Sequence, residues 1–176
     1  MKKQLITLCC GALMLAACHS AKEPSHDELA ATIDSIETSL LDATRLESVD
    51  TAEGNNIIRL YTKFADTYPD DTLTAKYLHN AAKVACGMNL IDEMTEFYDR
   101  VIDNYPDYSQ LAECYYEKGI ALDNAGRKEE ARQAYQEFLE NYPDHFLAND
   151  IRMALPLLDL SDEMLIKHLQ KMNKTE

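Results

Sequence analysis

Residues 105–144 read YPDYSQLAECYYEKGIALDNAGRKEEARQAYQEFLENYPD, so that this stretch begins and ends with the same three letters. The string also occurs upstream, because Tyr68-Pro69-Asp70 precedes Tyr105-Pro106-Asp107 and Tyr142-Pro143-Asp144 at equal spacings of 37 residues. Equal spacing of this length is typical of stacked copies of one supersecondary unit that share a continuous core. The central part of the chain is therefore predicted to be a repeat protein.

Each interval between these tripeptides contains two stretches with the periodicity of an amphipathic helix. Apolar residues recur every three or four positions across residues 73–85 and 90–102, and again across residues 111–122 and 131–139. Proline ends each second helix, because it lacks an amide donor and disfavours α geometry in the residue before it. The 176 residues include only 5 glycines and 5 prolines, too few for the frequent turns of a β-sandwich. The sequence therefore predicts an all-α fold of helix pairs.

The unit resembles the tetratricopeptide repeat, in which a tryptophan, a glycine, a tyrosine, a small residue and a phenylalanine precede a final proline at fixed offsets. With Pro143 at that proline, the corresponding residues are Tyr115, Gly119, Leu122, Ala131 and Tyr135. In the preceding unit, the places that match are filled by Leu78, Ala82, Met94 and Tyr98. The resemblance implies a short right-handed α-solenoid of about three antiparallel helix pairs, closed by a C-terminal capping helix.

The two ends of the repeat array depart from the pattern. At the N-terminal end, Arg45 stands where the family has glycine, so residues 27–46 are expected to form a longer helix in place of a regular one. At the C-terminal end, Pro156 should end or kink a further first helix. Ser161 should then cap a last helix over residues 162–172.

The N-terminal residues have the features of an export signal. Lys2 and Lys3 precede 13 uncharged residues from Leu5 to Ala17, too short a stretch to span a bilayer. Its end, Leu15-Ala16-Ala17-Cys18, resembles the lipobox of bacterial lipoproteins, which implies cleavage before Cys18 and acylation of that cysteine. The predicted organisation is a signal peptide at 1–17, a lipidated linker at 18–26 and a helical domain at 27–176.

The residues after Cys18 bear on the destination of the chain. His19 follows the cysteine where an aspartate would mark inner-membrane retention, so the expected location is the outer membrane, facing the periplasm. Lys22-Glu23 weakly resembles a surface-export tag, which leaves exposure at the cell surface open. A short solvated linker explains these two residues equally well.

Charge and composition exclude several function classes. The chain carries 17 basic and 31 acidic residues, for a net charge of −14, which repels nucleic acid. Cys86 and Cys114 are expected to be free helical cysteines rather than a disulfide pair. The sequence contains no phosphate-binding loop, no nucleophile elbow and no zinc-protease motif. We expect no enzyme, no cofactor and no metal site.

The resemblance instead implies a protein or peptide partner, because the first helices of tetratricopeptide units line a concave face that holds extended peptides. The residues expected on that face are Lys76, His79, Asn80 and Lys83 in one unit and Glu113, Tyr116, Glu117 and Ile120 in the next. Some family members hold a terminal carboxylate with lysine and asparagine at such positions. Ordinary exposed helix residues would give the same pattern.

The function expected from these features is that of an adaptor or scaffold of the cell envelope, anchored through acylated Cys18. One alternative is a structural lipoprotein that self-associates through its N-terminal helix. Leu29, Ile33, Ile36 and Leu40 are spaced there like a short coiled-coil seam.

Overall fold

The computed structural model describes residues 23–42, 51–161, 163–164, 166–167 and 170. Within these residues the chain forms helices and no strand. The α-helices are α1 (His26–Asp42), α2 (Thr51–Thr67), α3 (Thr74–Gly87), α4 (Ile91–Asn104), α5 (Leu111–Asn124), α6 (Lys128–Asn141) and α7 (Ala148–Ala154), followed by the 3₁₀ turn η1 (Leu155–Leu157). The predicted all-α fold is confirmed.

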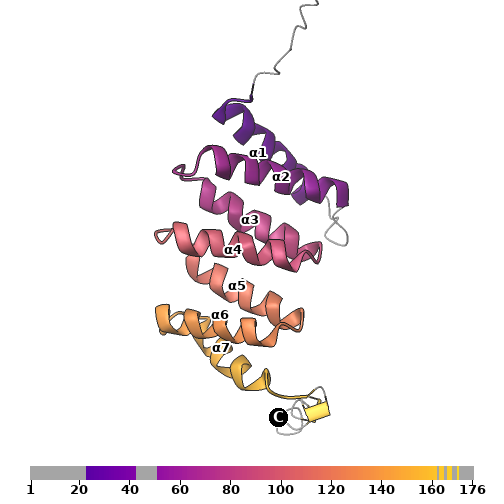
Figure 1. Ribbon diagram of the computed structural model, residues 1–176, viewed down its shortest axis with the longest axis vertical. Coiled ribbons are helices and arrows are strands. Elements are labelled where there is room, and N and C mark those ends of the chain that lie inside the picture. The colour runs from indigo at the N-terminus through magenta and orange to yellow at the C-terminus, as the bar shows by residue number, and fades with distance from the viewer. Residues whose placement is uncertain (1–22, 43–50, 162, 165, 168–169, 171–176) are drawn as a thin grey trace, which may run out of the picture.

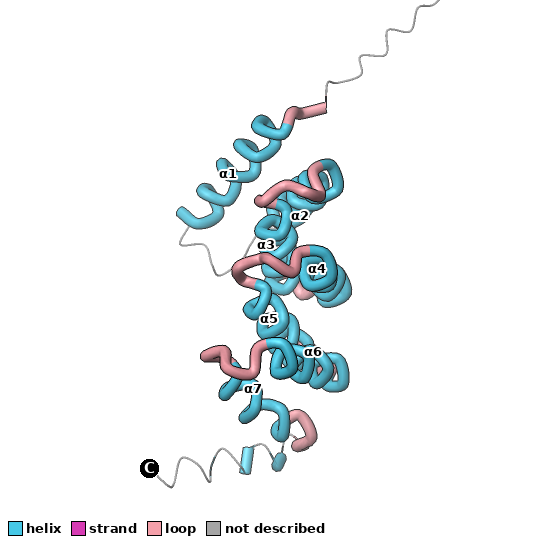
Figure 2. The backbone as a smooth tube through the Cα atoms, turned by 90° about the vertical axis from the view of Figure 1, so that its left-hand side faces the viewer, coloured by secondary structure: helices cyan, strands magenta, loops and turns pink. Residues whose placement is uncertain are grey.

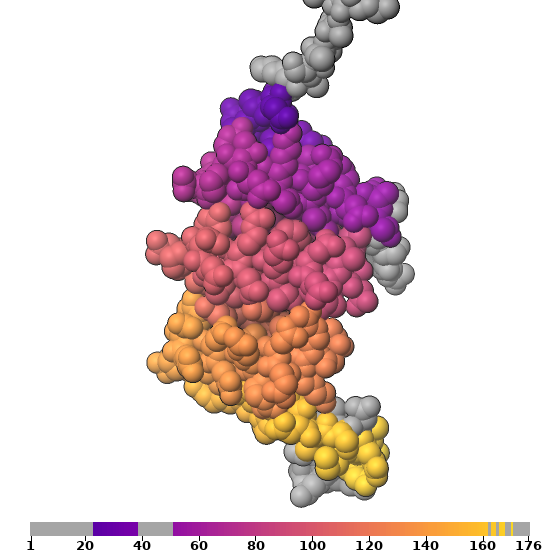
Figure 3. Space-filling view, viewed as in Figure 1, coloured from indigo at the N-terminus to yellow at the C-terminus, as the bar shows by residue number. Residues whose placement is uncertain are grey.

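The helices stack along one long axis, and each packs against the next in the sequence (Figure 1). Figure 2 shows two layers, with α1, α3, α5 and α7 on one side and α2, α4 and α6 on the other. The pairs α1–α2, α3–α4 and α5–α6 are the three units of a solenoid similar to tetratricopeptide repeats. The space-filling view shows the units as successive layers of one continuous body (Figure 3).

The 37-residue period is repeated in the backbone hydrogen bonds of the junctions between units. After α2, the Asp71 amide donates to the Tyr68 carbonyl and the Thr74 amide donates to the Asp71 carbonyl, both at 3.1 Å. The same two bonds recur after α4 and after α6, where they join Tyr105, Tyr108 and Leu111, and then Tyr142, His145 and Ala148. Each Tyr-Pro-Asp tripeptide therefore folds as the same turn.

The turns within the units are also equivalent. Asn89 and Gly126, which are 37 residues apart, are the left-handed residues of the two turns, with φ angles of 59° and 75°. The next amide in each turn donates back across the helix end, from Leu90 to the Ala85 carbonyl and from Arg127 to the Leu122 carbonyl. This is the arrangement of a Schellman C-cap, which glycine favours because it lacks a Cβ.

The core lies between the two layers and is apolar. Its largest fully buried side chains include Phe64, Tyr98, Tyr135 and Phe138. Gly119 faces the Tyr135 ring so closely that an added Cβ would lie 2.4 Å from Cε1 of that ring. The glycine expected from the repeat pattern therefore allows α5 and α6 to approach each other.

The N-terminal helix does not offer the seam that self-association would need. Leu29 and Ile33 are buried in the core of the same chain, and Ile36 packs against that core. These three side chains therefore pack inside one molecule. The hypothesis that they form an exposed coiled-coil seam is wrong. The side chain of Leu40 and the position of Arg45 lie outside the described residues.

At the C-terminal end, α7 stops at Ala154 and η1 contains Pro156, as expected of a proline that ends a helix. Residues 163–164, 166–167 and 170 are helical, and Met164 and Ile166 are 49% and 55% exposed. The rest of the expected capping helix, the signal peptide, Cys18 and most of the linker lie outside the described residues. None of the described helices is long and apolar enough to cross a bilayer.

Candidate functional site

Lys76 and Asn80, expected on the partner-binding face, bind a carboxylate of the same chain. Glu37 of α1 accepts hydrogen bonds from Asn80 Nδ2 at 2.8 Å and from the Tyr61 hydroxyl at 2.8 Å, and Lys76 Nζ lies 3.3 Å from its second oxygen. Burial, together with the hydrogen bond to Glu37, raises the pKa of Tyr61. These contacts join α1 and α2 to α3, so the polar groups of Lys76 and Asn80 already have partners.

His79 differs most from its expected position, because it is only 2% exposed. Its Nε2 donates to Glu117 Oε2 at 2.8 Å, and its Nδ1 lies 3.1 Å from the Tyr108 hydroxyl. The Tyr98 hydroxyl donates to the same oxygen of Glu117 at 3.0 Å. His79 is thus a buried link between α3 and α5, not an exposed residue of a groove.

Glu117 is held ionised by these neighbours. Burial alone would raise the pKa of Glu117, but the hydrogen bonds from His79 and Tyr98 and the nearby charge of Lys83 bring that pKa below its ordinary value. Its side chain remains 35% exposed, so one edge of the carboxylate faces the surface. Glu117 therefore belongs both to the joint between units and to the surface beside it.

The hydrogen bonds around Glu37 and those around Glu117 form two joints between units, and the tyrosines in these joints are equivalent positions of the repeat. Tyr61 and Tyr98 are 37 residues apart, and each donates a hydrogen bond to a carboxylate on the layer that contains α1, α3 and α5. The buried tyrosines of α2 and α4 thus each hold a carboxylate, Glu37 of α1 within the first unit and Glu117 of α5 in the following unit. Because a buried carboxylate without donors is costly, such bonds also fix the relative position of the units.

Three of the expected residues, Lys83, Glu117 and Ile120, line a small cavity. It has a volume of about 240 Å³ and is lined by Lys83, Cys86, Tyr98, Glu117, Ile120, Ala121 and Asn124. Lys83 is exposed, and within the described residues it forms no ion pair. Ile120, Ala121 and the Tyr98 ring provide apolar surface, so the cavity combines an apolar wall with the exposed Lys83, whose charge lies near that of Glu117.

Glu113 and Tyr116 lie beside this cavity on α5 rather than in it. Both are half-buried, and the Tyr116 ring packs on Phe138 with centroids 6.5 Å apart. Cys86, Tyr98 and Asn124 were not among the expected residues. The spacing of Glu117, Ile120 and Asn124, at i, i+3 and i+7 of one helix, is the signal that would have extended the predicted face to Asn124.

The two cysteines carry no reactive character. Cys86 and Cys114 are both free thiols. Burial raises the pKa of Cys86, and burial together with nearby Glu117 raises the pKa of Cys114 to about 12. Both therefore remain protonated near neutral pH. Among the described residues there is no group of three histidine, cysteine or acidic side chains that could hold a metal ion.

Comparison with known proteins agrees with this architecture. Residues 110–145 match the family model of the tetratricopeptide repeat. Comparison with curated proteins gives no match. The matched segment covers α5, its turn and α6, and the helix pair before it has the same turns at a distance of 37 residues. The chain is thus a TPR-like protein, with a tetratricopeptide-like repeat at α5–α6 in a solenoid of similar helix pairs.

Proposed function

We propose that the chain is a lipid-anchored protein-interaction module of a bacterial cell envelope, which binds a protein or peptide partner on the face formed by α3 and α5. Tetratricopeptide repeats are typically interaction modules rather than enzymes, and the match over residues 110–145 supports this class. The cavity beside Lys83 is the observation on which the position of the partner rests.

The lining of the cavity indicates what it accepts. A volume of about 240 Å³ fits one apolar side chain of a partner. Lys83 stands at the same site without an ion pair among the described residues, on a chain of net charge −14. An apolar residue followed by a carboxylate would fill the cavity and pair with this cation. Lys76, His79 and Asn80 are left out of the proposed contact because they join the units.

The lipid anchor rests on the sequence. The Leu15-Ala16-Ala17-Cys18 string resembles a lipobox, and several acyl chains on Cys18 would give stable membrane attachment. Tethering would raise the local concentration of the module near an envelope partner, which suits a shallow surface of modest affinity. Outer-membrane location, facing the periplasm, is part of the proposal because His19 and not aspartate follows Cys18.

Self-association through α1 is the alternative that the structure disfavours. Leu29 and Ile33 are 2% and 0% exposed, so a second copy could reach them only if α1 left its own core. An oligomer held by this helix would therefore have to unfold the first unit, and the interaction module is the better reading.

Cross-linking in the bacterium that makes the protein tests the position of the partner. A photoreactive residue replaces Ile120 at the cavity or, as a control, the exposed Gln133 on α6. We expect a defined cross-linked partner from position 120 only, and its loss when Lys83→Glu is added. A partner captured equally at both positions, or retained by the Lys83→Glu variant, would place the interface elsewhere.

The anchor is tested separately. Mass spectrometry of the mature protein should find an acylated Cys18 at its N-terminus, and the Cys18→Ser variant should remain unacylated and leave the membrane fraction. A mature protein that begins at another residue would contradict the anchor and leave the partner-binding face unaffected.

A further inference from the structure

We propose that the cleft between the first two Tyr-Pro-Asp junctions is a second binding site, which takes a lysine or arginine side chain from an extended basic segment of a partner protein. The cleft lies at the edge of the solenoid where α2 leads into α3 and α4 leads into α5, the edge along which the junctions project (Figure 1). None of the residues that line it also lines the cavity beside Lys83, so this site is independent of the proposed concave-face contact.

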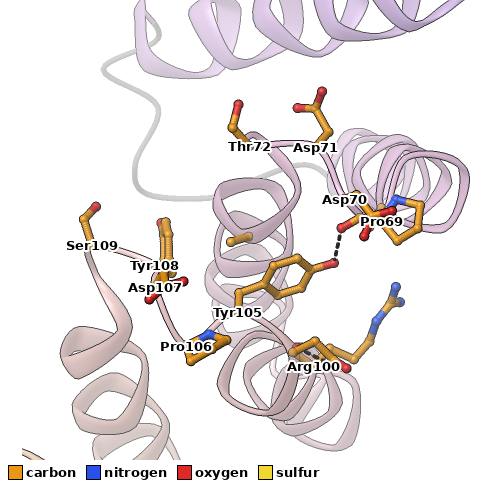
Figure 4. A pocket seen from close by; sticks show the side chains of 13 residues that line it. Pro69, Asp70, Asp71, Thr72, Arg100, Tyr105, Pro106, Asp107, Tyr108 and Ser109 are labelled. Carbon is orange, nitrogen blue, oxygen red and sulfur yellow. Dashed lines mark hydrogen bonds between the residues drawn. The ribbon is translucent and has the colours of Figure 1, made fainter.

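The cleft has a defined shape. Its volume is about 940 Å³, and its two walls are residues 69–72 and residues 105–109. Figure 4 shows the Tyr105 ring lying between these walls. The Tyr105 hydroxyl donates to the Pro69 carbonyl at 2.9 Å. This bond joins one junction to the next, so the site is formed before a partner binds. Little of the binding free energy is therefore needed to order the cleft.

Small residues leave the cleft open. Ala65 and Ala75 lie on its lining, from α2 and α3. The residues that follow Ala65 at intervals of 37 are Ile102 and Leu139, whose larger side chains would occupy such a space. Ala65 is therefore a departure from the repeat at the first junction.

The charges around the cleft favour a cation. Asp70 and Asp107 are exposed, stand on opposite walls and form no ion pair within the described residues. Asp71 is already engaged, because it binds His26 at 2.9 Å. Arg100 also lines the cleft, but its charge is offset by Asp66 at 2.7 Å. The unpaired charge of the cleft is therefore negative.

A basic side chain fits this combination better than a metal ion does. The described residues provide no group of three metal ligands. A tyrosine ring between two carboxylates instead matches a long cationic side chain, whose stem packs on the ring while its head reaches a carboxylate. The third junction carries the equivalent Asp144, so an extended segment could follow the edge from one junction to the next.

The probe is a peptide of eight residues in which lysine and alanine alternate and both ends are blocked. The charge control is the same peptide with glutamate in place of lysine. Binding to the purified full chain is measured by fluorescence anisotropy at low salt. We expect the lysine peptide to bind and the glutamate peptide not to bind. Asp70→Asn combined with Asp107→Asn should weaken binding by roughly fivefold or more, as expected for the loss of two exposed ion pairs.

Two further variants separate this cleft from general attraction to an acidic protein. Glu96→Gln with Glu140→Gln removes the same charge from exposed residues of α4 and α6 outside the cleft and should leave binding within about twofold. Ser109→Trp obstructs the rim of the cleft without changing charge and should weaken binding. Equal losses in both charge variants, or no binding of the lysine peptide to the unaltered chain, would overturn the inference.

Discussion

The α3–α4 and α5–α6 units share a backbone and differ in the side chains that occupy equivalent positions. Their junctions and turns make the same hydrogen bonds at a distance of 37 residues. On the face that contains α3 and α5, however, His79 is replaced by Tyr116 and Asn80 by Glu117. The 37-residue period therefore determines the backbone of each unit, whereas side chains that depart from the period form the polar contacts and the cavity between units.

The joints show the same contrast. Tyr61 and Tyr98 each donate to a carboxylate. Their equivalent, Tyr135, makes no such bond in the described part of the chain, and the residue 37 positions after Glu117 is Ala154. The first units are thus joined by buried polar contacts, whereas the C-terminal end relies on apolar packing and leaves Phe146 76% exposed.

The largest effect should come from the close approach of α5 to α6. Gly119→Ala would place a Cβ against the buried Tyr135 ring, and such overpacking should cost about 2 kcal/mol or more of unfolding free energy. Ala82→Gly, at the equivalent position of α3, should cost only about 1 kcal/mol through helix propensity. Urea denaturation of both variants measures the difference, and equal losses would mean that the two units pack alike.

The next largest effect on stability should come from Tyr98, which binds Glu117, and not from its repeat equivalent Tyr135. Tyr98→Phe removes a hydrogen bond to the partly buried Glu117 and should cost about 1.5 kcal/mol, because bonds to charged groups exceed neutral ones. Tyr135→Phe should cost less than about 0.5 kcal/mol, as expected where no such bond is lost. Thermal unfolding followed by circular dichroism measures both. A larger loss at Tyr135 than at Tyr98 would reverse the comparison of the joints.

Substitutions in the turns within units should change the unfolding free energy by smaller amounts and in opposite directions. Gly126→Ala forces a side chain into the left-handed region and should cost about 1 kcal/mol. Asn89→Gly relieves the same strain in the preceding turn and should stabilise the protein by about 0.5 kcal/mol. Denaturant midpoints of the two variants provide the measurement, and a destabilised Asn89→Gly protein would show that the asparagine side chain contributes more than its backbone geometry indicates.

The smallest effect should be the acid dependence of the joint at Glu117. Because the pKa of Glu117 is below its ordinary value of 4.5 in the folded protein, its ionised form stabilises the fold above that value. This contribution is lost as the pH falls through the lowered pKa. The difference in melting temperature between the unaltered protein and Glu117→Gln should therefore be constant near neutral pH and shrink below pH 4.5. A difference that grows on acidification would contradict the ionised joint.

Much of the fold could be predicted from the sequence because its determinants are local. Residues 90–102 were expected to be helical, and α4 spans Ile91–Asn104. Proline, the left-handed turn residues and the apolar period all act over a few residues, so they mark element boundaries directly. The predicted resemblance to tetratricopeptide repeats is confirmed over residues 110–145.

The candidate site was harder to predict because its contacts join distant residues. His79 and Glu117 are 38 positions apart, and Asn80 and Glu37 are 43 positions apart. The period of one helix shows which residues share a face, but it does not show which neighbouring helix covers them. Lys76, His79 and Asn80 therefore had the pattern of exposed groove residues although the structure gives them partners within the chain.

One experiment on α3 separates the residues proposed to bind a partner from those that join the units. Lys83→Glu and Asn80→Asp each make α3 more negative, at positions that are three residues apart. The yield of the cross-link at position 120 is measured in cells, and the melting temperature is measured on the purified variants. Lys83→Glu should abolish the cross-link and lower the melting temperature less than Asn80→Asp does, since Lys83 is exposed and acts on Glu117 only through its nearby charge.

Asn80→Asp should have the larger effect on stability, because its added charge opposes the Glu37 carboxylate at a contact of 2.8 Å. Its melting temperature should fall while the cross-link persists below the melting point. Loss of the cross-link in Asn80→Asp with an unchanged melting temperature, together with retention in Lys83→Glu, would contradict the division of α3 into a joint and a binding face.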